Sequence, residues 1–183
     1  NKERQAAAEA LRESEELYRA IFNNASVGIE LLDRHTRFVE VNHTLADFLG
    51  YTPEELEKLR ALDVTHPDDR TRSEGRHAAV VRGESEGYRL EKRYVGETGN
   101  VLWADVAVSA IREPDGLYRA TVGVISDITK RKKSEEARVR LAAAVEQAAE
   151  AVEITDPQGF IMYVNPAFER ITGYALEEVI GKK

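Results

Sequence analysis

The chain repeats itself after 123 residues, since Asn165 follows Asn42 and Gly173 follows Gly50 at this distance. When residues 25–56 are laid over residues 148–179 without a gap, nine of the 32 positions are identical. Ordinary residue usage would give about two identities by chance. The period is too long for a solenoid unit, which has roughly 20–50 residues. The repeat therefore predicts tandem domains, with one complete module followed by the opening of a second.

The composition excludes several classes of protein. The net charge of −7 argues against a general nucleic-acid binder, which presents a basic face. The chain has no cysteine for a disulfide, a thiolate metal site or thiol chemistry. No apolar run approaches the roughly 20 residues of a membrane span, and no signal peptide is visible. We therefore expect no membrane span in this chain, and nothing in the composition contradicts a cytoplasmic location, while a membrane tether elsewhere in a longer parent is left open.

The hydrophobic pattern predicts a mixed α+β domain. Helical periodicity is followed by an apolar hairpin, by short helices with good capping residues, and by three longer strands. This order predicts a five-stranded antiparallel sheet with the short helices on one face. The expected strands cover residues 27–32, 38–41, 88–95, 101–111 and 117–128, and the expected short helices cover residues 42–49, 52–56 and 66–81.

Two amphipathic helices flank the complete domain. An apolar stripe runs along residues 1–22, and a stripe of the same kind follows the last strand, so the lead-in helix is part of the repeat. Such a stripe needs a partner, and the nearest candidate is the same helix of another copy. We therefore expect a homodimer formed through these helices. The residues assigned to the dimer helices are Leu11, Tyr18, Ile21, Phe22, Leu141 and Val145.

The motifs resemble those of the PAS domain family. Val41-Asn42, Gly50-Tyr51 and Glu54-Glu55-Leu56 are similar to the first half of a PAS domain, and this pattern returns between residues 164 and 178. His66-Pro67-Asp68-Asp69, Gly99 with Trp103, and residues 123–132 resemble its second, PAC-type half. We assign residues 1–22 to an N-terminal signalling and dimerisation helix, 23–128 to a PAS domain, 129–150 to a coiled-coil-like connector helix, and 151–183 to the truncated start of a second PAS domain.

The resemblance implies a cytoplasmic sensory or relay module of a bacterial signalling protein, usually dimeric and often with a small internal cavity. In this family the last strand ends in an Asp-x-Thr junction that passes strain to the following helix, and here the junction consists of Asp127 and Thr129. Either side chain is able to cap the emerging helix while it is tied to the edge of the sheet. We expect signal coupling at these two residues.

Several side chains are candidates for a ligand pocket, with packing of the core as the alternative. The candidates are His77, Val81, Tyr88, Leu90, Trp103, Val122 and Val124. His77 is the candidate axial ligand if the domain binds haem, because the family takes that ligand from the same helix. A flavin is conceivable only without a cysteine adduct, because the chain has no cysteine. We expect no cofactor and no metal, with haem or flavin as the alternatives.

The chain has no catalytic motif: a phosphate-binding glycine loop, a nucleophile elbow and metal-ligand spacing are all absent. We expect a non-catalytic input module whose output domain lies elsewhere in the same polypeptide, most simply a sensor histidine kinase of a two-component system. The alternatives are a diguanylate cyclase or phosphodiesterase, or a haem- or flavin-binding gas or redox sensor. The second module lacks its last three strands, so its exposed edges invite either disorder or pairing with another copy.

Overall fold

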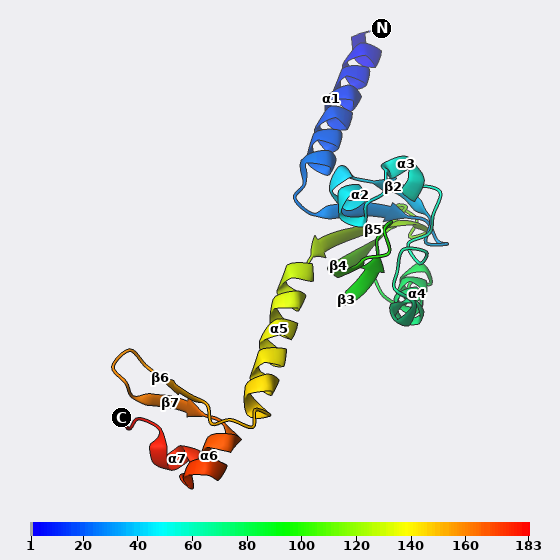
Figure 1. The fold of residues 1–183 in the computed structure, drawn as a ribbon. Helices are drawn as coiled ribbons and strands as arrows, with labels where there is room; N and C mark the ends of the chain where they lie inside the picture. Colours follow the sequence, from blue (N-terminus) through cyan, green and yellow to red (C-terminus); the bar gives the residue numbers. More distant parts are fainter. Residues whose placement is uncertain (1) are drawn as a thin grey trace. The chain divides into compact units, whose positions relative to one another are not determined.

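The computed structural model describes residues 2–183, with side chains from residue 4 onward. The chain divides into two compact units, the first ending at Thr129 and the second beginning at Lys130. Each unit has its own sheet (Figure 1). The units are described separately below.

The first unit contains the predicted five-stranded antiparallel sheet, in the strand order β2-β1-β5-β4-β3. The first and last strands of the domain, β1 and β5, lie side by side at its centre. The junction at the end of β5 is therefore attached to the middle of the sheet. The strands are β1 (Gly28–Leu32), β2 (Phe38–Val41), β3 (Gly87–Val95), β4 (Val101–Arg112) and β5 (Tyr118–Asp127).

Four helices belong to the described part of the first unit, and capping residues fix both ends of α2 and the start of α3. The side chain of Asn42 caps α2, Gly50 ends that helix in the left-handed conformation with φ 82°, and Thr52 with Glu55 forms a capping box for α3. Leucines of α2 and α3 share one buried core with the inner face of the sheet. The helices are α1 (Lys2–Asn24), α2 (His43–Leu49), α3 (Pro53–Leu56) and α4 (Pro67–Val81).

Helix α5 (Thr129–Glu146) begins in the first unit and belongs mostly to the second. The second unit then contains a two-stranded sheet and two short helices. Its elements are β6 (Glu153–Thr155), β7 (Ile161–Val164), α6 (Pro166–Thr172) and α7 (Leu176–Val179). Two helix ends differ from expectation: α1 continues to Asn24 and α5 already stops at Glu146. The residues after α5 turn into β6 instead of continuing the helix.

Candidate functional site

The register of the sheet decides which side chains share its inner face. Tyr88 of β3 lies opposite Val108 of β4, Val108 lies opposite Gly123 of β5, and Gly123 lies opposite Glu30 of β1. Directly opposite residues point to the same face, and successive residues of one strand point to opposite faces. Tyr88 therefore shares a row with Glu30 on the helix-covered face, and Leu90 follows on that face in the next row.

Trp103, Val122 and Val124 lie on the other face of the sheet, so the expected single pocket is split between two faces. Val124 is 38% exposed, and the Trp103 ring lies 5.5 Å from the Arg93 guanidinium carbon. Val122 lines a small apolar groove together with residues of α1 and β1. The grouping fails because Val122 and Val124 flank the inward-facing Gly123, and a strand alternates its side chains with a period of two.

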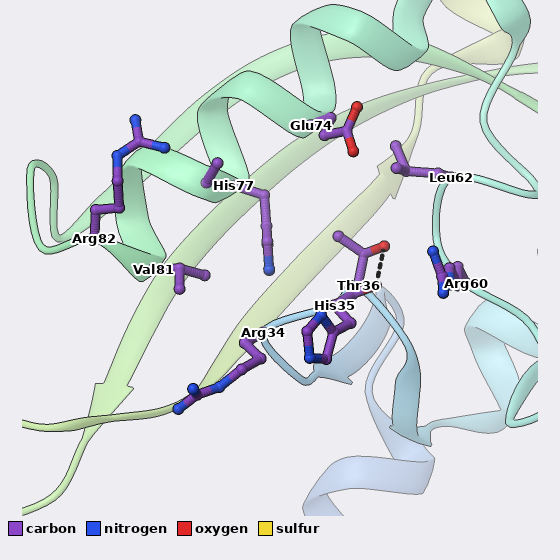
Figure 2. A pocket seen from close by; sticks show the side chains of 10 residues that line it. Arg34, His35, Thr36, Arg60, Leu62, Glu74, His77, Val81 and Arg82 are labelled. Atoms are coloured by element: carbon purple, nitrogen blue, oxygen red, sulfur yellow. Dashed lines mark hydrogen bonds between the residues drawn. The ribbon is translucent and has the colours of Figure 1, made fainter.

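A pocket of about 330 Å³ opens between α4, the β1–β2 turn and the segment before α4 (Figure 2). Figure 2 shows the His77 side chain between α4 and the turn that carries Arg34 and His35. Val81 lines the same pocket, so the structure brings together two of the seven candidate residues here. The lining consists of Arg34, His35, Thr36, Arg60, Leu62, Glu74, His77, Ala78, Val81 and Arg82.

His77 is 4% exposed and attaches α4 to the β1–β2 turn. Its Nε2 lies 3.2 Å from the carbonyl oxygen of Asp33. A carbonyl only accepts, so Nε2 carries the proton and Nδ1 is the unprotonated nitrogen of the neutral ring. Burial lowers the pKa of His77, which favours this neutral form. Nδ1 is buried and has no hydrogen-bond partner among the described residues.

His77 and the residues that line the adjoining pocket do not fit a haem with His77 as its axial ligand. The proton-bearing Nε2 faces a backbone carbonyl, and Nδ1 is enclosed by protein. The adjoining pocket is lined by three arginines, two histidines and a glutamate, whereas a cofactor pocket is lined mainly by apolar and aromatic side chains. Among the described residues, no group of three His, Asp or Glu side chains is arranged to hold a metal ion.

Two buried ionisable residues, Glu30 and Lys92, lie inside the first unit and were not singled out from the sequence. Glu30 is 2% exposed and Lys92 is 5% exposed. Burial raises the pKa of Glu30 to about 7, and the positive charge of Lys92 opposes that rise. Burial lowers the pKa of Lys92 to about 8, with Glu30 opposing. The Lys92 ammonium donates to the Thr65 hydroxyl at 3.1 Å.

Gly123 leaves room for the Glu30 side chain. A Cβ atom at Gly123 would lie 2.8 Å from both Cγ and Oε1 of Glu30, closer than packed atoms approach.

Burial, with the charge of Glu30 as a smaller cause, raises the pKa of both Tyr88 and Tyr94. A usable signal in the sequence was the period of two in β3, which places Lys92 on the same face as Tyr88 and Tyr94.

The two predicted coupling residues, Asp127 and Thr129, meet where β5 passes into α5. Asp127 Oδ1 accepts from the amide of Thr129 at 2.8 Å. The Thr129 hydroxyl accepts from the Trp103 amide at 2.9 Å and donates to the Trp103 carbonyl at 3.3 Å. The amide of Ile128 donates to the same carbonyl at 2.9 Å. The start of α5 is therefore hydrogen-bonded to β4.

A matching attachment holds the helix that enters the domain. The Asn42 side chain donates to the carbonyls of Phe22 and Val27, at 2.8 and 3.0 Å. Its Oδ1 accepts from the amides of Ile29 and Leu45, at 2.8 and 3.0 Å. We call this set of four hydrogen bonds the asparagine clamp. It joins the end of α1 to β1 and α2, although the sequence pointed to Asn42 only through the repeat and the family motif.

The residues assigned to the dimer helices differ in exposure. Phe22 is buried and Val145 is half-buried, whereas the others are exposed: Leu11, Tyr18, Ile21 and Leu141. Tyr18 also stacks on Phe22 with ring centroids 5.4 Å apart. Within the described part of the chain, no helix has the length and hydropathy needed to cross a membrane.

Comparison with known proteins relates this geometry to one family. The family model described as the PAS fold matches residues 16–128 and 140–183. A domain of a sensory box sensor histidine kinase/response regulator from Geobacter sulfurreducens superimposes with a TM-score of 0.54 at 25% identity, covering 64% of this chain and 96% of that domain.

Two relatives are much longer than this chain. The probable diguanylate cyclase DgcE of Escherichia coli is 32% identical over 141 residues, covering 77% of this chain and 13% of the relative. The sensor histidine kinase TmoS of Ectopseudomonas mendocina is 26% identical over 154 residues, covering 84% of this chain and 16% of the relative. The family match extends over both halves of the internal repeat. The chain therefore belongs to the PAS family.

Proposed function

We propose that the first module senses or relays a signal and passes it from its sheet into α5 through Asp127 and Thr129. The observation that carries this proposal is the pair of hydrogen bonds between the Thr129 hydroxyl and the backbone of Trp103. Because β4 lies between β3 and β5, a change in the sheet alters the anchor of the helix directly. The helix then transmits a rotation or a shift of register to whatever follows it.

The module works, in this proposal, within a longer signalling protein whose output domain lies outside this chain. A sensor histidine kinase is the first candidate, supported by the likeness to TmoS and to the Geobacter sulfurreducens domain. A diguanylate cyclase is the second candidate, supported by the likeness to DgcE. The parent protein incubated with radiolabelled ATP or with GTP distinguishes them, by phosphorylation of a histidine or by formation of a cyclic dinucleotide.

We further propose that two copies pair through α1 and α5, which expose Leu11, Ile21 and Leu141. Side chains of this kind lose contact with water when two such helices pack together. Sedimentation of this chain at micromolar concentration tests the pairing. A dimer that becomes a monomer in Ile21→Glu supports it, and a monomeric wild-type chain contradicts it.

The coupling role is tested in the full-length parent with Thr129→Val, which keeps the shape of the side chain and removes its hydroxyl. The expected result is an output activity that no longer responds to the stimulus while the protein stays folded. The matched control is Thr98→Val in the exposed β3–β4 turn, where the hydroxyl only contacts Asn100. Normal regulation in Thr129→Val, or in Asp127→Ala, would contradict the proposal.

A further inference from the structure

We propose that the pocket beside α4 binds a small oxyanion, a molecule carrying a carboxylate or phosphate group, through Arg34 and Arg60. This inference names a ligand class for the sensory role proposed above, and in that respect it rests on the proposed function. The binding itself stands on the geometry of the pocket. The ligand is expected to carry an N–H or O–H donor as well, because Glu74 also lines the pocket.

The charge of the pocket is opposite to that of the chain. Three guanidinium groups line it against one carboxylate, whereas the whole chain carries a net charge of −7. Guanidinium groups bind carboxylates and phosphates through two parallel hydrogen bonds, which gives them both affinity and geometric selectivity. A cluster of positive charge on an acidic protein therefore favours an anionic ligand at this place.

Two of the three arginines form no ion pair within the described part of the chain. Arg82 donates to Glu84 at 2.6 Å, so its charge is largely satisfied by the protein. Neither Arg34 nor Arg60 has a carboxylate within ion-pair distance among the described residues. Their guanidinium groups lie on separate segments, the β1–β2 turn and the loop before α4. Figure 2 shows the Arg34 side chain pointing away from Arg60, so an anion bound by both would draw the two segments together.

The turn beneath the pocket is held in a strained conformation. Thr36 has φ 62°, and it is the only residue other than glycine with a positive φ among the described residues. A β-branched residue seldom adopts this conformation. Two hydrogen bonds hold it there, from its amide to Asp33 at 3.1 Å and from the Ala61 amide to its carbonyl at 2.8 Å. Strain of this kind collects at ligand sites and switches.

The second module supplies an internal comparison, because it lacks this set of residues. At the offset of the repeat, Arg34, His35 and Thr36 correspond to Pro157, Gln158 and Gly159. Gly159 has φ 86°, so both turns share the left-handed position, and the first module places a threonine where the second has the unstrained glycine. The two turns therefore share a backbone conformation, and only the turn of the first module combines an arginine with a strained threonine.

The pocket has a volume that suits a small metabolite, and hydrogen bonds connect it to the sheet. Its volume of about 330 Å³ lies at the lower end of the range for small-molecule pockets. Asp33, whose carbonyl holds His77 and Thr36, directly follows β1. A ligand that draws the turn toward Arg60 would therefore pull on both α4 and β1, and β1 pairs with β5.

Isothermal titration calorimetry of this chain with L-malate and with inorganic phosphate, at physiological salt, tests the proposal. Binding of either probe with a dissociation constant in the millimolar range or tighter is the expected result, and the probe that binds tells carboxylate from phosphate. Arg34→Gln and Arg60→Gln are each expected to weaken binding by about tenfold or more, since each removes a charge-assisted hydrogen bond. Arg119→Gln, outside the pocket, is the matched control and should bind as the wild type does.

Circular dichroism and the melting temperature without ligand show that each variant is folded. No heat of binding with either probe, or equal binding by Arg34→Gln and the wild type, would overturn the proposed site. Such a failure is distinct from a failure of the coupling role, because the Thr129→Val experiment reads the output of the parent protein and needs no identified ligand.

Discussion

The two modules contain the same asparagine clamp but differ in what they bury. Asn165 donates to Val145 and Glu150, both at 3.0 Å. It accepts from the amides of Val152 and Phe168, at 2.9 and 3.0 Å. Every one of these partners lies 123 residues after its counterpart around Asn42. The clamp is therefore built by local sequence, which the repeat carries in both copies.

The cores differ because a core needs distant strands. Glu30 is enclosed beneath helices by the five-stranded sheet, whereas its counterpart Glu153 is exposed on a two-stranded one. Ile161 is only half-buried in the second module for the same reason, whereas its counterpart Phe38 is buried in the first. Local hydrogen bonds form without the rest of the domain, but burial of charge and of apolar side chains requires β3, β4 and β5.

The largest effect is expected from Asn42→Ala, which removes all four hydrogen bonds of the clamp at a side chain that is fully buried. Two amides and two carbonyls lose their partner, so the free energy of unfolding of the first unit should fall by about 4 kcal/mol. Urea unfolding followed by Trp103 fluorescence measures this, because the only tryptophan lies in the first unit.

Asn165→Ala is the matched variant in the second module. It should leave the Trp103 transition unchanged and alter only the methyl NMR signal of Met162, the only methionine of the chain. Equal shifts of the Trp103 transition in both variants would contradict the independence of the two units.

The next largest effect is a pH dependence of the free energy of unfolding, which arises from Glu30 of the first module. Burial raises the pKa of Glu30 from its ordinary value of 4.5 to about 7, so the folded chain holds this proton more tightly than the unfolded chain. The resulting stabilisation is complete below about pH 4.5 and is lost as the pH rises through about 7. The loss amounts to about 3 kcal/mol at most. Urea unfolding between pH 4.5 and 7.5 measures it.

Glu30→Gln removes the titrating group while keeping its shape, so its stability should no longer fall across this pH range. Lys92 does not interfere, because burial lowers its pKa only to about 8, above the range. Glu153→Gln is the exposed control and should retain the wild-type slope. A fall in stability with rising pH that persists in Glu30→Gln would assign the pH dependence to other groups.

The smallest effect is expected at the glycines that end α2 and α6. Gly50 and Gly173 both adopt the left-handed conformation, with φ 82° and 80°. Alanine at Gly50 should cost about 1–2 kcal/mol through backbone strain, with a further contact between its Cβ and that of Glu97 at 3.6 Å. Gly173→Ala meets no atom within 4 Å and should show the strain alone, in the Met162 signal. A neutral Gly50→Ala would contradict the strain argument.

The sequence predicted the fold well because its signals are local. The period of the repeat, the capping residues of the short helices and the alternation of the strands led to a five-stranded antiparallel sheet with helices on one face. The predicted ends of α1 and α5 differ from the observed ends, because helix periodicity decays gradually where the chain leaves the helix.

The candidate site was harder to predict because it depends on pairing between distant strands. Val122 and Val124 are apolar and suitably placed along the chain, but only the register of β5 against β4 shows that they lie on the outer face. The burial of Glu30 depends on Gly123, 93 residues further along the chain. No local sequence pattern reveals a contact between residues so far apart in the chain. A charged residue within an apolar strand is therefore the first position to examine for burial of this kind.

Amide hydrogen exchange of the Trp103 backbone and the first turn of α5, compared between the wild-type chain and Thr129→Val, tests the attachment of helix to sheet most directly. Removal of the hydroxyl takes one hydrogen bond from the Trp103 amide, so exchange there and at the start of α5 should accelerate by about tenfold. Exchange in β3 should stay unchanged, as it should throughout Thr98→Val. Unaltered exchange at Trp103 and α5 in Thr129→Val would contradict the central claim that this hydroxyl ties the outgoing helix to the sheet.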